Sequence, residues 1–139
     1  GGIDKETLEE IYKFGNGNPQ RIQQICYHLF QKVLNGEKLK ASLVKETVIE
    51  ICLSLGKEFE TEFDNIKSLR QKQVLKALAI EKDPKPLSNE FIRKYDLGGA
   101  SSVQSALKGL IEKGLLDENH KFVDPLFKTW LWFKHEGII

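Results

Sequence analysis

The clearest pattern of apolar and polar positions is helical and lies in NPQRIQQICYHLFQKVLNG, residues 18–36. Apolar side chains recur there three and four positions apart, as one face of an α-helix requires. They are Ile22, Ile25, Cys26, Leu29, Phe30 and Val33. Asn18 is a favourable N-cap, Pro19 suits the first turn and Gly36 suits the end. We therefore predict a helix between Pro19 and Gly36 that buries this stripe.

Helical patterns also flank that stretch. In DKETLEEIYKF, one face carries Leu8, Ile11 and Tyr12. A third helix is predicted from about Leu43, with the stripe Val48, Cys52, Leu55, Phe59 and Phe63. Gly56 lies within it and marks a kink or a break, because glycine is a poor helix former. Residues 1–64 are thus expected to form a helical subdomain without strands.

The pattern of apolar and polar positions changes after residue 64. SLRQKQVLKALAIE predicts a helix, DPKP predicts a loop, and LSNEFIRKYDL predicts a short helix capped by Ser88. The turn GG at 98–99 leads into SSVQSALKGLIEKG, where Ser101 and Gln104 fit a capping box and Gly114 ends the helix. The side chains expected to face inward are Leu69, Val74, Leu75, Leu78, Phe91, Ile92, Tyr95, Val103, Ala106, Leu107, Leu110 and Ile111.

The last segments complete a recognisable order. LLDENHKFVD predicts two short strands around a polar turn, and Asp124 and Pro125 then begin the aromatic helix PLFKTWLWFK. Trp130 and Trp132 are two positions apart, so they face different ways and one should point outward. Helix, helix, turn, helix, hairpin, helix is the order of a winged-helix domain. We expect a mainly α fold, with a winged helix-turn-helix domain over residues 65–139.

Taken together, these motifs resemble the C-terminal lid and winged helix of an archaeal-type P-loop ATPase of the AAA+/STAND kind. GNGNPQRIQQICYHL resembles the lid motif, a Gly-x-Pro at a helix start. LRQKQVLKALA, SSVQSALKGLIEKGLL and FVDPLFKTWL resemble its winged helix. The family turn reads Gly-Gly, whereas this chain has Asn16-Gly17. Because asparagine tolerates a left-handed conformation, we expect the turn to survive.

The resemblance implies nucleotide-contacting residues in the parent protein, namely Gly17, Asn18, Pro19 and Arg21. There the proline would rest against the adenine and the arginine would approach the phosphates, with the helix N-terminus favouring an anion. The alternative is purely structural: an Asn cap, a first-turn proline and a solvated arginine. The chain has no P-loop and no acidic magnesium site. ATP and Mg²⁺ would therefore belong to a missing N-terminal P-loop core, and this fragment is not expected to be an enzyme.

Charge bears on the choice of partner. Residues 1–64 carry 8 basic and 11 acidic side chains, whereas residues 65–139 carry 13 and 9. The mildly basic charge of the second half is compatible with contact to duplex DNA but is not evidence for it. The residues expected to meet DNA or a partner are Arg93, Lys94, Ser102, Gln104, Ser105, Lys108 and Lys121. The predicted recognition helix has no arginine and carries Glu112, so docking onto a protein remains open.

Other features narrow the class of protein. No run approaches the ~18 apolar residues of a membrane span, and no signal peptide is evident. Cys26 and Cys52 are interpreted as reduced core thiols, which fits the cytoplasm. The three histidines share no metal-ligand spacing. The alternative function is a stand-alone winged-helix transcription regulator that dimerises through its first three helices.

Overall fold

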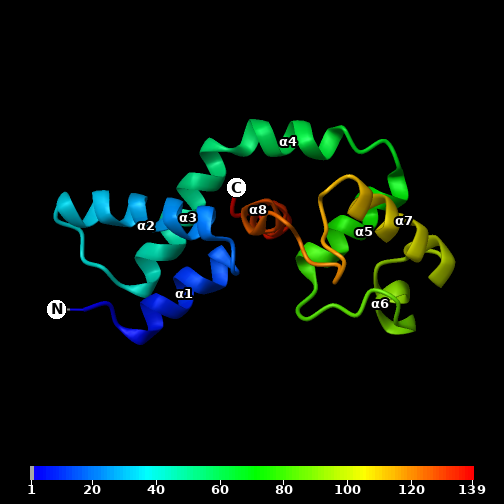
Figure 1. The fold of residues 1–139 in the computed structure, drawn as a ribbon, viewed down its shortest axis with the longest axis horizontal. Helices are drawn as coiled ribbons and strands as arrows, with labels where there is room; N and C mark the ends of the chain where they lie inside the picture. The colour runs from blue at the N-terminus through cyan, green and yellow to red at the C-terminus, as the bar shows by residue number, and fades with distance from the viewer. Residues whose placement is uncertain (1) are drawn as a thin grey trace.

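The computed structural model describes residues 2–139, and that part of the chain contains eight helices and no extended sheet (Figure 1). The fold is mainly α, as predicted. The helices are α1 (Lys5–Gly15), α2 (Pro19–Leu34), α3 (Ala41–Ser54), α4 (Gly56–Asp64), α5 (Leu69–Ile80), α6 (Asn89–Lys94), α7 (Ala100–Glu112) and α8 (Pro125–His135). Figure 1 shows α1–α3 on one side, α5–α7 on the other and α8 between them.

Three predicted caps are confirmed. The Asn18 side chain accepts a hydrogen bond from the Arg21 amide at 3.1 Å, Ser88 accepts from Phe91 at 3.2 Å, and Asp124 accepts from Leu126 at 3.0 Å. The capping box predicted for α7 is wrong. Its N-cap is Gly99, with no side-chain cap bond, because the helix already begins at Ala100 and Ser101 lies inside its first turn.

The third predicted helix is interrupted at the expected place. α3 ends at Ser54, and α4 begins at Gly56 after one residue of turn. A side chain at Gly56 would meet the Trp130 indole nitrogen only at ordinary contact distance, 3.6 Å. The break lets α4 leave α3 and run toward α5 (Figure 1). On the way Phe59 packs against Phe127, with ring centroids 5.4 Å apart.

The winged-helix order is confirmed as α5, α6, α7, hairpin and α8, but the hairpin is shorter than predicted. Residues 115–123 do not form two strands, and a single antiparallel bridge joins Leu116 to Phe122. The Asp117 carboxylate accepts hydrogen bonds from the amides of Asn119 and Lys121, which folds the tip tightly. Helix α8 begins directly after the hairpin. Too few residues therefore remain in the hairpin to form a longer ladder of paired strands.

Helix α8 holds the molecule together. It packs against α1, α3, α4 and α5, so both halves of the sequence share one hydrophobic core. Phe133 meets Phe14 of α1 at a centroid distance of 6.3 Å, and Phe127 stacks with Trp130 at 6.1 Å. The division at residues 64 and 65 therefore stays an interpretation of the sequence, since both parts close around the same helix.

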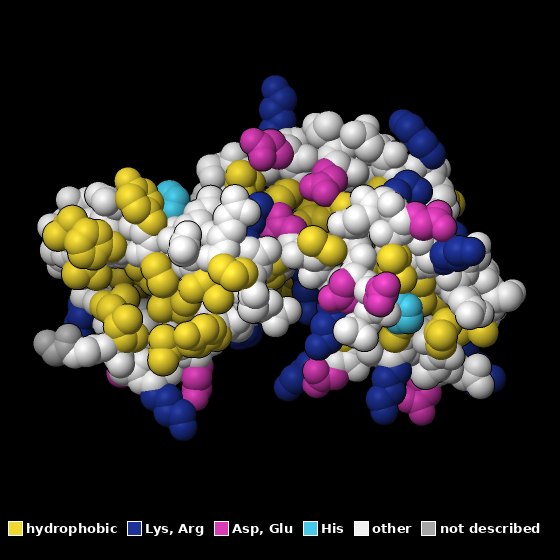
Figure 2. Space-filling view, in the orientation of Figure 1, with side chains coloured by type: hydrophobic (Ala, Val, Ile, Leu, Met, Phe, Trp, Pro, Cys, Tyr) yellow, Lys and Arg dark blue, Asp and Glu magenta, His cyan; other side chains and the backbone are white. Residues whose placement is uncertain are grey.

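Burial differs from prediction mainly in α1 and α2. Of the α2 stripe, only Ile25 and Leu29 are fully buried. Packing against α1 and α3 covers one side of α2, and within residues 2–139 no other helix makes comparably extensive contact with it. The residues wrongly predicted to face inward are Leu8, Tyr12, Cys26, Phe30, Val33 and, in α5, Leu69. Hydrophobic side chains gather over α1 and α2 in Figure 2.

We call this surface the α1–α2 apolar face. It consists of Leu8, Tyr12, Tyr27, Phe30, Val33 and Leu34, which are 39% to 64% exposed.

Candidate functional sites

The turn between α1 and α2 has the geometry expected from the sequence. Asn16 is left-handed at φ 37°, and Gly17 follows at φ 74°. The prediction that asparagine can take this position is confirmed. Gly15 packs so tightly against Ile22 that a side chain there would clash with it. Pro19 occupies the first turn of α2 and is exposed, so its ring is accessible to a ligand.

Arg21 lies beside that turn but is not a solvated side chain. Its Nε donates to Asp124 Oδ1 at 3.0 Å and its Nη2 to Asp124 Oδ2 at 2.6 Å, a bidentate ion pair. Its Nη1 donates to Gln24 at 2.7 Å. The two paired side chains are only 19% and 27% exposed. Arg21 thus fastens the start of α2 to the N-cap of α8, a contact that sequence spacing could not reveal.

The surroundings of this ion pair are partly dry. The Phe59 ring lies 6.0 Å below the Arg21 guanidinium. Burial, and then the nearby Asp124 carboxylate, raise the pKa of the Cys52 thiol to about 12. The same two causes, in the same order, raise the pKa of Glu62. Cys52 is a free thiol in the core, as predicted, whereas Cys26 is also free but exposed, so its predicted place in the core is wrong.

A shallow groove of about 600 Å³ runs beside the turn. It brings the predicted nucleotide residues Gly17, Asn18 and Pro19 next to the hairpin, represented by Phe122 and Val123. The Asn18 side-chain amide reaches the Val123 carbonyl at 3.4 Å, a long hydrogen bond. The lid-like turn and the wing are therefore neighbours.

Only some of the predicted partner-contacting residues of the second half lie together in one groove. Gln104, Ser105 and Lys108 line a groove of about 710 Å³ on α7, with Glu112 and the His120 side chain of the hairpin. Ser102 lies outside that groove and is only partly exposed.

The remaining predicted cations do not join this groove. Lys94 of α6 forms a 2.7 Å ion pair with Glu81. That hydrogen bond raises the pKa of Lys94 and lowers the pKa of Glu81. Arg93 and Lys121 are exposed on α6 and on the hairpin tip.

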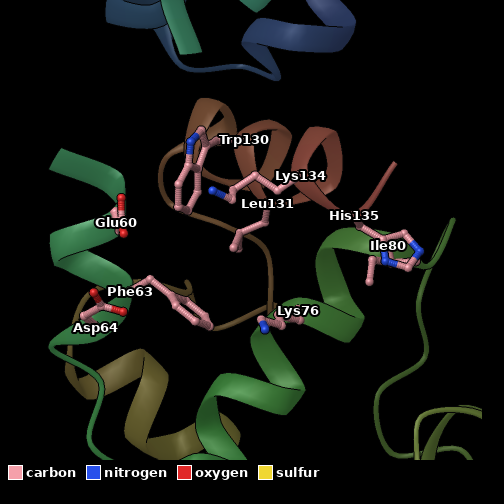
Figure 3. A pocket seen from close by; sticks show the side chains of 9 residues that line it. All are labelled: Glu60, Phe63, Asp64, Lys76, Ile80, Trp130, Leu131, Lys134 and His135. Carbon is pink, nitrogen blue, oxygen red and sulfur yellow. The ribbon is translucent and has the colours of Figure 1, made fainter. Parts of the chain in front are cut away.

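A third site was not anticipated from the sequence. A cavity of about 350 Å³ lies between α4, α5 and α8 (Figure 3). Its lining residues are Glu60, Phe63, Asp64, Lys76, Ile80, Trp130, Leu131, Lys134 and His135. The charged members follow ordinary solvent-facing positions on three separate helices, so no local pattern indicates that they meet.

The two tryptophans face different surroundings, as predicted, but neither is exposed, so the prediction that one of them points outward is wrong. Helix α8 packs against α1, α3, α4 and α5, which cover it on several sides. Trp130 is 5% exposed and lines the cavity, whereas Trp132 is partly buried beside Lys13 and Phe14 of α1. Within residues 2–139, no three His, Cys, Asp or Glu side chains are grouped as a metal site would need. In the same part of the chain, no helix combines the length and the apolarity that crossing a bilayer demands.

Comparison with known proteins agrees with the winged-helix order. The family described as "Probable winged helix domain" matches residues 58–132, more than half of the chain, and the chain belongs to that family. The matched region begins within α4 and includes most of α8. No curated protein and no solved structure matches the chain. The family relation shows a winged helix, and the resemblance to an ATPase lid remains an inference from the motifs.

Proposed function

We propose that this chain is the regulatory and interaction region of a nucleotide-dependent switch ATPase. Residues 1–64 would close as a lid over nucleotide held by a separate P-loop core, and the winged helix would contact DNA or a protein partner. The observation that carries the proposal is the turn before α2. Two left-handed residues, an Asn cap and an exposed Pro19 present a helix N-terminus to a groove.

The chain would have no catalytic centre of its own. Its 139 residues contain neither a P-loop nor a strand ending in paired acids, so ATP and Mg²⁺ would be held by the core. Gly17, Asn18 and Pro19 would contact the nucleotide from the lid side. One helix N-terminus and one proline offer few contacts, so the chain alone should bind ATP only weakly.

Arg21 would couple the lid to the winged helix. A phosphate could take its guanidinium only in competition with Asp124 and Gln24, because Nε and Nη2 already donate to that carboxylate and Nη1 donates to Gln24. Asp124 caps α8, and α8 packs on α1, α3 and α5. A shift of the turn between α1 and α2 would therefore be transmitted to both halves of the chain. The ion pair offers a direct mechanical link for the switch.

The α1–α2 apolar face supports docking onto another protein. Its side chains are large, and hydrophobic side chains gather over α1 and α2 in Figure 2, as is typical of interaction sites. In the proposed function this face meets the ATPase core. The same observation favours the second candidate, a winged-helix regulator that dimerises through α1–α3.

Two measurements on the 139-residue chain separate these functions. Titration of an isotope-labelled sample with ATP and Mg²⁺ should shift amide resonances of residues 16–21 only at about millimolar nucleotide. Light scattering should give a monomer. A stable dimer with no response to nucleotide would favour the regulator, and a micromolar affinity for ATP would contradict the absence of an independent nucleotide site.

A further inference from the structure

The cavity between α4, α5 and α8 is separate from the nucleotide turn and from the α7 groove. Its volume of about 350 Å³ lies within the range of small-molecule pockets. Phe63, Trp130 and Leu131 give it an apolar wall contributed by two helices (Figure 3). Phe63 is the most exposed of the three, since Trp130 and Leu131 are only 5% and 7% exposed, and a ligand ring can pack against it.

Two lysines of the lining each place their ammonium group over an aromatic ring of this wall. The Lys134 ammonium lies 5.0 Å from the centre of the Trp130 ring, and the Lys76 ammonium lies 5.2 Å from that of Phe63. Neither forms a salt bridge or a hydrogen bond with another side chain among residues 2–139. Figure 3 shows them approaching the cavity from opposite ends. They are cations held in place by aromatic rings and still able to bind an anion.

The opposite wall carries the opposite charge. Glu60 and Asp64 lie one helical turn apart on α4, and in the described residues neither carboxylate has an ion-pair partner. Figure 3 shows both on the same side of the cavity, across from His135. Two lysines and two acids leave the lining without net charge, and a third lysine, Lys72, lies outside the lining with its ammonium 5.4 Å from the centre of the Phe63 ring. A polyanion such as a nucleotide would be repelled by the acids, and a simple cation by the lysines.

We propose that this cavity binds a small aromatic zwitterion, of which a free aromatic amino acid is the simplest example. The ring would rest on Leu131 between Phe63 and Trp130. The carboxylate would pair with Lys76 or Lys134 at one end of the cavity, and the ammonium group would face Glu60 and Asp64. Each charged group of the ligand thus finds a partner that is free in the empty cavity.

Such a ligand would act on the connection between the two halves of the chain. α4 is the only segment that leads from α3 to α5, and the cavity lies where it meets α5 and α8. A ligand that touches all three helices binds the docked arrangement and not an undocked one. By mass action it would stabilise the junction and make the winged helix respond to a metabolite.

The test uses L-phenylalanine and NMR spectra of the ring protons of the tryptophans. Trp130 should shift with a dissociation constant of about 0.1–1 mM, while Trp132, which lies outside the cavity, stays as an internal control. 3-Phenylpropionate lacks the ammonium group and 2-phenylethylamine lacks the carboxylate, so each should bind about tenfold more weakly. ATP should leave Trp130 unchanged.

Substitutions in the cavity test which protein side chains bind the carboxylate and the ammonium group of the ligand. The double variant Lys76→Gln, Lys134→Gln should weaken phenylalanine about tenfold and leave 2-phenylethylamine unchanged, whereas Glu60→Gln, Asp64→Asn should spare 3-phenylpropionate. Lys57→Gln and Glu58→Gln, exposed on α4 and not among the residues that line the cavity, are matched controls and should change nothing. No Trp130 shift at about 10 mM phenylalanine, equal binding of all three compounds, or tighter binding of ATP would overturn the proposal.

Discussion

Helices α2 and α8 begin in the same way but have very different surroundings. Both begin with a cap and a proline, and both carry many large apolar residues. Yet only two side chains of α2 are fully buried, whereas seven of α8 are. α8 lies between the two halves, and α2 packs on one side only. A strong helical stripe therefore identifies a helix without telling how many neighbours will cover it.

The largest expected contrast concerns the two cysteines. Cys26 is on the exposed side of α2, and Cys52 is completely buried with its thiol donating to the Leu126 carbonyl of α8 at 3.8 Å. Modification of Cys52 requires opening of the core, which should slow it at least about a thousandfold relative to Cys26. Mass spectrometry after timed alkylation of the native protein measures both rates. Equal rates would show that α8 separates easily from α3.

The same thiol predicts a pH dependence of stability. In the unfolded chain Cys52 ionises near its ordinary pKa of 9.0, whereas burial raises the pKa to about 12 in the folded protein. The folded state keeps its proton while the unfolded state loses it, so the free energy of unfolding falls as the pH rises from about 9 to about 12. Cys52→Ala should reduce that loss, and Cys26→Ala is the control.

A second contrast concerns the core. Phe127→Ala in α8 should lower the free energy of unfolding by about 3–5 kcal/mol, because the ring is 1% exposed and packs against Phe59, Phe122 and Trp130. Phe30→Ala in α2 removes a ring of the same size that is 60% exposed, and should cost less than about 1 kcal/mol. Urea unfolding measures both. Similar losses would mean that another surface covers the α1–α2 apolar face in solution.

The third prediction concerns the link between the two helices. Arg21→Ala should lower the free energy of unfolding by about 1–3 kcal/mol, because it leaves a mostly buried Asp124 carboxylate without its bidentate partner. Asp124→Asn keeps a good N-cap for α8 and removes only the charge, so it separates capping from pairing. If the pair acts as proposed, the double variant should cost clearly less than the sum of the two single changes. Strict additivity would show that the ion pair contributes nothing.

The sequence predicted local structure better than contacts between distant segments. Caps such as Asn18 and Ser88, the left-handed Asn16 and the break at Gly56 depend on a few neighbouring residues, and these predictions were confirmed. The Arg21–Asp124 pair joins residues 103 positions apart, and the cavity of Figure 3 draws on three helices. No periodicity encodes such meetings, since they depend on how the helices cross. The short hairpin was missed because apolar runs cannot show that Asp117 would close the turn so tightly.

The smallest expected effect concerns nucleic acid. Of the four cations expected to meet phosphates, Lys94 already pairs with Glu81, which leaves Arg93, Lys108 and Lys121. Three contacts at most give a slope of log affinity against log salt no steeper than about −2.7.

Anisotropy of a labelled duplex at several salt concentrations tests this limit. Lys108→Glu should weaken binding on every sequence, because Lys108 is expected to hold the backbone and not to read bases. Glu81→Gln is the sharper variant. It removes the partner of Lys94 without adding a cation, so it should steepen the slope by about one contact, or 0.9, if Lys94 can then reach a phosphate. An unchanged slope would place α6 away from the duplex. No binding even at low salt would leave protein docking as the role of the α7 face.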